Sequence, residues 1–108
     1  MVPLICSPLG DGVRVATPMG VLVEVRNSTL SYIESKHPEM SSNRRSLIEA
    51  LERPDGLIKV EERGRFLAFK VRSARVGLGV VVVYDESGRL ITAYKTRDLE
   101  RLKRRYVT

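Results

Sequence analysis

The feature that most constrains the fold of this chain is an unbroken run of valines at residues 80–83. Because side chains alternate between the two faces of a strand, this β-branched run makes both faces apolar. Such a strand fits the centre of a sheet covered on both sides, and not its edge. Residues 85–88 (DESG) then have turn chemistry, and residues 89–96 return. The sequence therefore predicts a hairpin in the middle of a sheet, around which the chain is organised.

The returning strand presents two sets of side chains, which the period of two assigns to opposite faces. One set is predicted to comprise Leu90, Thr92, Tyr94 and Thr96. The other is predicted to comprise Ile91, Ala93 and Lys95. We expect any chemistry of this protein to lie beside Thr92 and Tyr94.

The remaining elements follow from hydrophobic periodicity, capping residues and turn signals. A first helix ends near residues 36–37, with Leu30, Ile33 and Tyr32 on its inner face, and Ser41 or Ser42 caps a second. Further elements are a hairpin over residues 12–26, strands over 57–62 and 65–72, and a helix over 97–106 with Leu99, Leu102 and Tyr106 inward. The predicted fold is α+β, with two or three helices packed on an antiparallel sheet of about four strands, plus an N-terminal hairpin.

Length and composition predict one domain over residues 1–108, because no linker-like segment divides the chain. No apolar run approaches the roughly 20 residues that span a bilayer, and no signal peptide is recognisable, so we expect a cytoplasmic protein. The single Cys6 and single His37 exclude an internal disulfide and a Cys/His zinc site. We expect no metal and no cofactor. The absence of Gln and Trp, with many charges, is typical of thermophile proteins.

The net charge of +6 is unevenly distributed along the chain. Residues 1–40 hold three basic and four acidic side chains, residues 41–75 hold nine and five, and residues 76–108 hold seven and four. The basic part favours a polyanionic partner through counterion release and electrostatic steering. The alternative is a solvated, arginine-rich surface without a specific partner.

One kind of chemistry fits the available side chains. RNA is cleaved without metal when its 2′-hydroxyl attacks the adjacent phosphate, which requires a base, an acid and fixed cations. His37 and Glu39 are candidates for base and acid, and Tyr94 is a candidate donor to phosphate. The candidate RNA-binding cations are Lys70, Arg72, Lys95, Arg97 and Arg44.

Each candidate also has a plainer interpretation. Histidine is favoured electrostatically at a helix C-terminus, and Glu39 fits a solvated loop. Thr92 and Tyr94 are good strand formers, and Lys70 and Arg72 fit charges that protect a sheet edge.

Three short motifs carry a resemblance to a known family. His37-Pro38-Glu39, Pro54-Asp55 and Thr92-Ala93-Tyr94 occur here in the order found in phage members of the barnase/EndoU/colicin/RelE-like nuclease group. The resemblance covers roughly residues 20–97 and implies a RelE/barnase-like fold and a metal-independent ribonuclease, often a toxin countered by an antitoxin protein. It implies catalytic roles for His37 and Glu39, which match the first motif, and for Thr92 and Tyr94, which match the third.

Three functions remain open at this stage. The first is a ribonuclease that uses these residues. The second is an RNA- or ribosome-binding protein without activity, held by a basic face of Lys70, Arg72 and residues 101–105. The resemblance allows this, because Tyr32 stands where many members of the resembled family have a histidine. The third is a protein-interaction module with an acidic partner or a second copy of itself as a homodimer.

Overall fold

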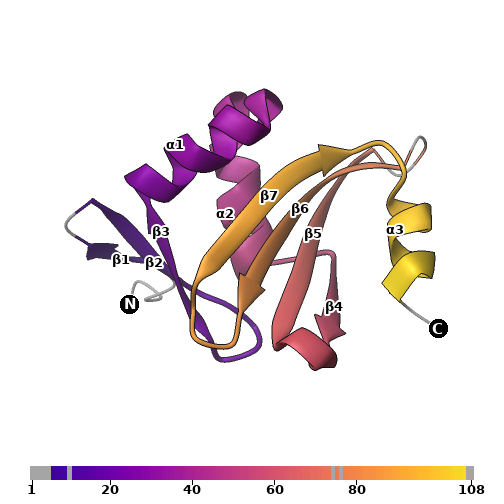
Figure 1. Ribbon diagram of the computed structural model, residues 1–108. Coiled ribbons are helices and arrows are strands. Elements are labelled where there is room, and N and C mark those ends of the chain that lie inside the picture. The colour runs from indigo at the N-terminus through magenta and orange to yellow at the C-terminus, as the bar shows by residue number, and fades with distance from the viewer. Residues whose placement is uncertain (1–5, 10, 74, 76, 107–108) are drawn as a thin grey trace.

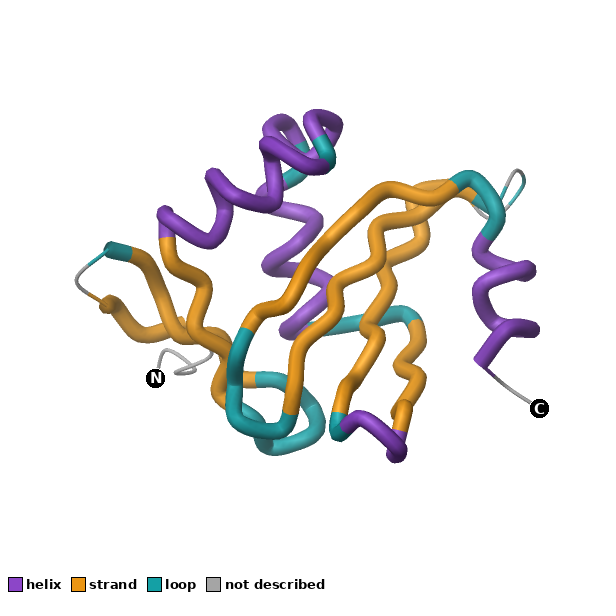
Figure 2. The backbone as a smooth tube through the Cα atoms, in the orientation of Figure 1, coloured by secondary structure: helices purple, strands orange, loops and turns teal. Residues whose placement is uncertain are grey.

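The computed structural model describes residues 6–9, 11–73, 75 and 77–106 (Figure 1). Figure 2 shows the strands as a curved central layer with helices on both sides of it. In the described part of the chain the strands are β1 (Cys6–Leu9), β2 (Gly12–Ala16), β3 (Leu22–Arg26), β4 (Gly56–Val60), β5 (Arg65–Ser73), β6 (Leu78–Asp85) and β7 (Leu90–Thr96). The α-helices are α1 (Asn27–Lys36), α2 (Arg44–Glu52) and α3 (Leu99–Tyr106), and the 3₁₀ helices are η1 (Pro38–Ser42) and η2 (Glu61–Arg63).

The strands form two antiparallel sheets, a three-stranded one in the order β1-β2-β3 and a four-stranded one in the order β4-β5-β6-β7. The sheets meet at a parallel bridge between Glu24 and Arg89, where the Glu24 N–H donates to the Gly88 carbonyl over 2.9 Å. Gly88 has φ 90°, and a Cβ there would lie 2.1 Å from the Leu22 carbonyl oxygen. Only glycine fits this junction, which fixes the N-terminal hairpin against the β6–β7 turn.

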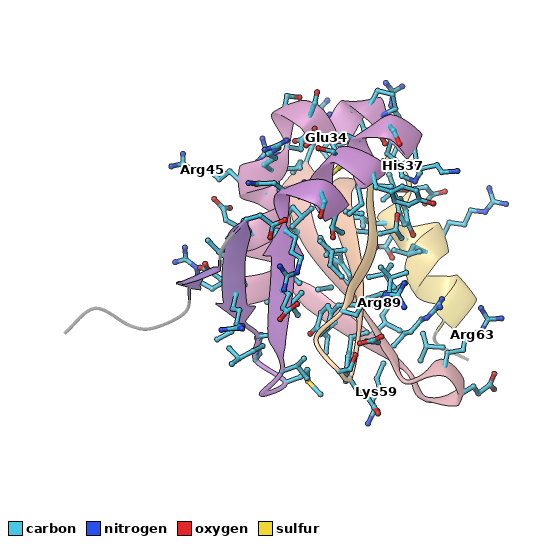
Figure 3. The ribbon with its side chains drawn as sticks, turned by 60° about the vertical axis from the view of Figure 1, so that its left-hand side comes forward. Glu34, His37, Arg45, Lys59, Arg63 and Arg89 are labelled. Atoms are coloured by element: carbon cyan, nitrogen blue, oxygen red, sulfur yellow. The ribbon has the colours of Figure 1, made fainter. Side chains whose placement is uncertain are left out.

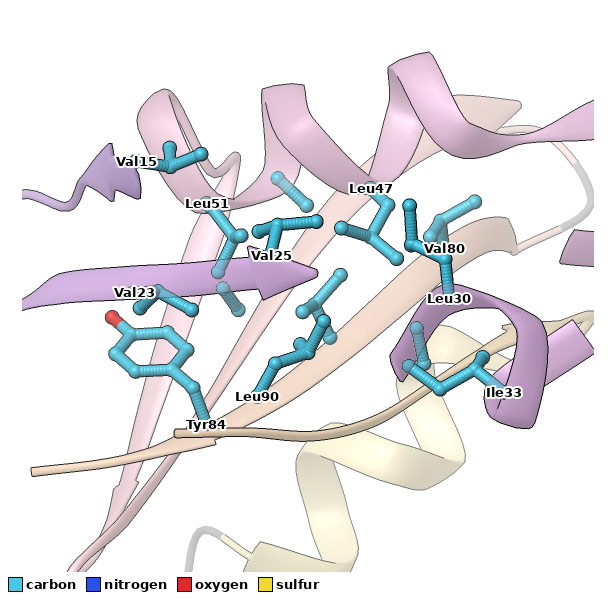
Figure 4. Close-up of a cluster of buried hydrophobic side chains, with 14 of the residues drawn as sticks. Val15, Val23, Val25, Leu30, Ile33, Leu47, Leu51, Val80, Tyr84 and Leu90 are labelled. Carbon is cyan, nitrogen blue, oxygen red and sulfur yellow. The ribbon is translucent and has the colours of Figure 1, made fainter. Parts of the chain in front are cut away.

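Strand β6 separates two hydrophobic clusters. Val80, Val82 and Tyr84 belong to the first cluster, which the N-terminal hairpin, α1 and α2 complete (Figure 4). Val81 and Val83 face the second cluster, to which α3 contributes Leu99 and Leu102. Figure 1 shows α3 on the other side of the sheet from α1 and α2.

The structure confirms the α+β prediction, the four-stranded antiparallel sheet and the N-terminal hairpin. Strand β6 is central as predicted, but β7 is an edge strand, so the hairpin does not lie in the middle of the sheet. The predicted order of elements has no strand before residue 12, although Cys6 alone is expected in an N-terminal strand, and β1 contains it. Leu99 and Leu102 of α3 are inward as predicted, whereas the side chain of Tyr106 lies outside the described residues.

Two predictions about the first two helices are wrong. Tyr32 does not face the core but is 60% exposed, because the helical period of the buried Leu30 and Ile33 turns it outward. The second helix begins after Asn43 and not at Ser41 or Ser42, since Pro38 starts a 3₁₀ turn that takes up residues 38–42.

A bulge in β7 changes the predicted faces of that strand. Val83 pairs with Thr92, but Tyr84 pairs with Leu90, so Ile91 is an extra residue opposite β6. Leu90 therefore packs in the first cluster, whereas Tyr94 packs against the second. The prediction that Leu90 shares a face with Tyr94 is wrong, because a strict period of two does not survive a bulge.

Tyr84 is the one buried polar side chain whose hydroxyl has no hydrogen bond of normal geometry to a described residue. Its ring stacks on Phe66 with the centroids 5.2 Å apart, and the residue is fully buried. Burial raises the pKa of the Tyr84 phenol, an effect that the neighbouring Thr17 hydroxyl only partly offsets.

We expect Tyr84→Phe to change the free energy of unfolding by less than about 1 kcal/mol at neutral pH, because no good hydrogen bond is lost. The raised folded-state pKa favours unfolding once the pH rises above the unfolded value of about 10, so the variant should lose less stability there than the wild type. Urea unfolding of the variant and the wild type, at neutral pH and at a pH above the unfolded-state pKa of tyrosine, measures both free energies. The control Phe66→Ala should cost about 3–5 kcal/mol, and a similar cost for Tyr84→Phe would contradict the prediction.

Candidate functional site

His37 lies at the C-cap of α1, where Pro38 ends the helix. Its N–H donates to the Ile33 carbonyl over 2.7 Å. Its φ of −132° and ψ of 81° lie outside the helical region, which a residue before a proline avoids. Met40, in the next turn, is buried in the first cluster. Buried Ile33 and Met40 thus hold the turn from both sides and leave the imidazole at the surface (Figure 3).

Glu39 connects this turn to the edge strand β7. Its Oε2 lies 3.8 Å from His37 Nδ1 and accepts the Lys95 backbone N–H over 3.4 Å. The Asn43 side-chain amide donates to the Glu39 carbonyl over 2.7 Å, which fixes the backbone that carries the carboxylate. The Lys95 N–H belongs to an edge strand and has no partner strand on that side, so the Glu39 carboxylate supplies its acceptor. The side chains of His37 and Glu39 are each 37% exposed, so both are accessible to a ligand.

The rings of Tyr94 and His37 lie against each other at the edge of the sheet. The two ring centroids are 5.8 Å apart with an interplanar angle of 40°. Tyr94 is half-buried against the second cluster, whereas the turn that carries His37 packs on the first. The structure therefore brings together three of the four predicted catalytic residues, His37, Glu39 and Tyr94.

Thr92, the fourth predicted catalytic residue, is near this group but not in it. It pairs with Val83 and lies two residues before Tyr94 on the same face of β7, about 7 Å along the strand. Its side chain is half-buried. Thr92 thus flanks the Tyr94 ring and lies farther along the strand from the end of α1.

A cleft with a volume of about 610 Å³ adjoins Glu39. Among the described residues, Leu78, Lys95 and Arg97 also line it. The alternation of side chains puts Lys95 on the opposite face of β7 from Tyr94, as the sequence predicts, so the cleft and the phenol lie on two sides of one edge. Leu78 was not anticipated, because its position depends on the register of β6 and not on a local motif.

Lys70 and Arg72 are occupied elsewhere. Lys70 Nζ donates to the Arg53 carbonyl over 3.0 Å at the end of α2, and Arg72 Nη1 donates to Ser46 Oγ over 3.0 Å. Both side chains leave β5 on the first-cluster side and hold α2 on the sheet. These two hydrogen bonds are to α2 and its C-cap residue, and not to His37 or Glu39.

Arg44 is also engaged within the protein. Its Nε donates to Glu34 Oε2 over 2.6 Å and its Nη2 donates to Glu34 Oε1 over 3.1 Å, a bidentate pair that joins α1 to α2. The hydrogen bond from Arg44 lowers the pKa of the Glu34 carboxyl. Of the five predicted RNA-binding cations, two line the cleft, and the other three connect α2 to its neighbours.

The group at the edge of β7 has the components of a proton-transfer site. An imidazole and a carboxylate lie 3.8 Å apart, a phenol contacts the imidazole, and two cationic side chains lie beside the carboxylate. In the described residues no three His, Cys, Asp or Glu side chains are grouped to hold a metal ion. None of the described helices is both long and apolar enough to cross a membrane.

The contacts of Lys70 predict a structural role that can be measured. Lys70→Met should lower the free energy of unfolding by about 1 kcal/mol, because a charged donor is removed from the carbonyl end of α2. Lys95→Met is the matched control: it replaces an exposed strand lysine of the same sheet face and should leave stability unchanged. Urea unfolding of the two variants and the wild type checks this. Equal effects of both substitutions would contradict the role given to Lys70.

No family model, no curated protein and no solved structure matches this chain. The likeness to RelE/barnase-like nucleases therefore stays a prediction from the sequence motifs. The functional argument depends on the geometry of His37, Glu39 and Tyr94.

Proposed function

We propose that this protein cleaves single-stranded RNA without a metal ion, by attack of a 2′-hydroxyl on the adjacent phosphate. The observation that supports this most strongly is the meeting of His37, Glu39 and Tyr94 at the edge of β7. His37 and Glu39 come from one turn on the first-cluster side of the sheet, whereas Tyr94 comes from a distant strand and packs against the second cluster. The helix end and the strand edge account for the single positions of His37 and Glu39, whereas the proposed chemistry accounts for the three groups together.

The reaction needs two proton transfers, and the site offers two groups for them. One of His37 and Glu39 takes the proton of the 2′-hydroxyl as the O2′–P bond forms, and the other gives a proton to the 5′-oxygen as the P–O5′ bond breaks. The products are a 2′,3′-cyclic phosphate and a free 5′-hydroxyl. The 3.8 Å separation between His37 Nδ1 and Glu39 Oε2 lets one phosphate lie within reach of both groups.

The remaining residues stabilise charge on the phosphate. The Tyr94 hydroxyl donates to a non-bridging oxygen from one side of the β7 edge. Lys95 and Arg97 supply positive charge from the cleft on the other side, where negative charge develops in the transition state. Thr92 lines the approach to Tyr94 on the same strand face.

We expect His37→Ala and Tyr94→Phe to lower the rate of RNA cleavage by about 10²-fold or more, because each removes a group that acts on the transition state. RNA binding and the folded state should persist. The measurement is cleavage of a labelled single-stranded RNA in the presence of EDTA, with detection of the cyclic phosphate product. Lys70→Met is the control, since Lys70 contacts α2 and should leave the rate unchanged.

The assay also separates the alternatives. Cleavage that both substitutions leave unchanged would exclude this site. RNA binding that weakens steeply with salt, without any cleavage by the wild type, would show a binding protein and no enzyme. A protein that neither binds nor cleaves RNA would contradict the proposal altogether.

A further inference from the structure

A second hollow, with a volume of about 540 Å³, opens at the other end of β7. It lies where β3 and β7 separate beyond the bridge between Glu24 and Arg89. One wall comes from the start of α1, and the other comes from the β6–β7 turn and the first residues of β7. None of its described lining residues belongs to the group of His37, Glu39 and Tyr94.

Tyr32 lines this hollow and exposes its ring. The residue is 60% exposed, more than Leu22 at 54% or Met19 at 43%, which lie on the N-terminal hairpin. The Lys36 ammonium lies 5.7 Å from the centroid of the ring, one helical turn farther along α1. An exposed aromatic ring beside a hollow offers a flat apolar surface on which a planar ligand can stack.

The two arginines of the hollow differ in what they contact. Arg26 is held by Asp11 over 2.9 Å and by Glu24 over 3.2 Å, and the hydrogen bond to Asp11 is the main reason for its raised pKa. Arg89 is exposed, and its guanidinium makes no ion pair with any described residue. Arg89 also interacts electrostatically with the Asp85 carboxylate, so its charge is partly compensated. Because no ion pair fixes the guanidinium, it can still contact a phosphate at the hollow.

We propose that this hollow binds an unpaired base of a single-stranded RNA, with the base stacked on Tyr32 and a neighbouring phosphate at Arg89. The hydroxyls of Ser28 and Thr29, which also line the hollow, face the polar edge of the base. This inference rests on the proposed function in one respect, because it takes RNA to be the substrate. It adds a subsite for a base and the requirement that this base be unpaired.

The position of the hollow supports one continuous binding track. Ile91 lines the hollow and Tyr94 contacts His37, so the two sites are about 10 Å apart along β7. Figure 3 shows His37 and Arg89 on the same side of the molecule. One RNA strand that follows β7 therefore reaches both sites, whereas a duplex keeps its bases stacked inside and cannot place one on Tyr32.

The test is binding of a fluorescently labelled single-stranded 2′-O-methyl RNA, which lacks the attacking hydroxyl and stays intact. Tyr32→Ala should weaken binding by about 5- to 150-fold, which is the range for loss of one stacked base, and Tyr32→Phe should stay within about twofold of the wild type. Met19→Ala is the control, because it removes another exposed apolar side chain away from both sites. A duplex of the same sequence should bind more weakly than the single strand.

The outcomes separate this inference from the proposed activity. An affinity of Tyr32→Ala within about twofold of the wild type would overturn the base subsite, as would equal binding of the duplex. His37-dependent cleavage of unmodified RNA would then still support the proposed function. Weakened binding by Tyr32→Ala, in a protein that never cleaves RNA, would support the subsite and refute the activity.

Discussion

Both faces of β6 are apolar, and this single constraint requires cover on two sides of the sheet. Burying a valine side chain contributes roughly 1.5–3 kcal/mol, so neither face can be left open to water. The N-terminal hairpin, α1 and α2 cover Val80 and Val82, and α3 covers the side of Val81 and Val83. The order of layers follows from this requirement. The same requirement restricts where side chains accessible to a ligand can lie. A central strand with two buried faces has no such side chains, so a site on this sheet must lie at one of its edges.

The candidate site depends on β7 being an edge strand. His37 belongs to a turn anchored by Met40 on the first cluster, whereas Tyr94 is anchored on the second. Two side chains from opposite layers can meet only where the sheet between them ends. Glu39 completes the contact because its carboxylate reaches the backbone of the strand at Lys95. The same hydrogen bond that protects the edge from another strand thus positions the carboxylate beside the imidazole.

The sequence predicts those parts of this structure that depend on local pattern. The valine run, the turn at residues 85–88 and the N-terminal hairpin are visible in composition and periodicity. The bulge at Ile91 is not, because it depends on pairing with β6, and it moves Leu90 to the other face. The meeting of His37 with Tyr94 was anticipated through the family resemblance and the choice of chemistry, since no local signal links the end of a helix to a distant strand.

The charged residues show most clearly why a site predicted from sequence differs from the one in the structure. A basic segment predicts an anionic partner, but the partner of each cation is decided by tertiary contacts, and Lys70, Arg72 and Arg44 are satisfied by groups of the protein itself. What matters at the cleft is therefore local balance and not the net charge of +6. Glu39 is the one acidic side chain among the described residues that line this cleft, and it contacts the backbone N–H of Lys95. A hydrogen bond to a neutral N–H does not neutralise that carboxylate, so the described lining of the cleft carries the positive charges of Lys95 and Arg97 against the one negative charge of Glu39.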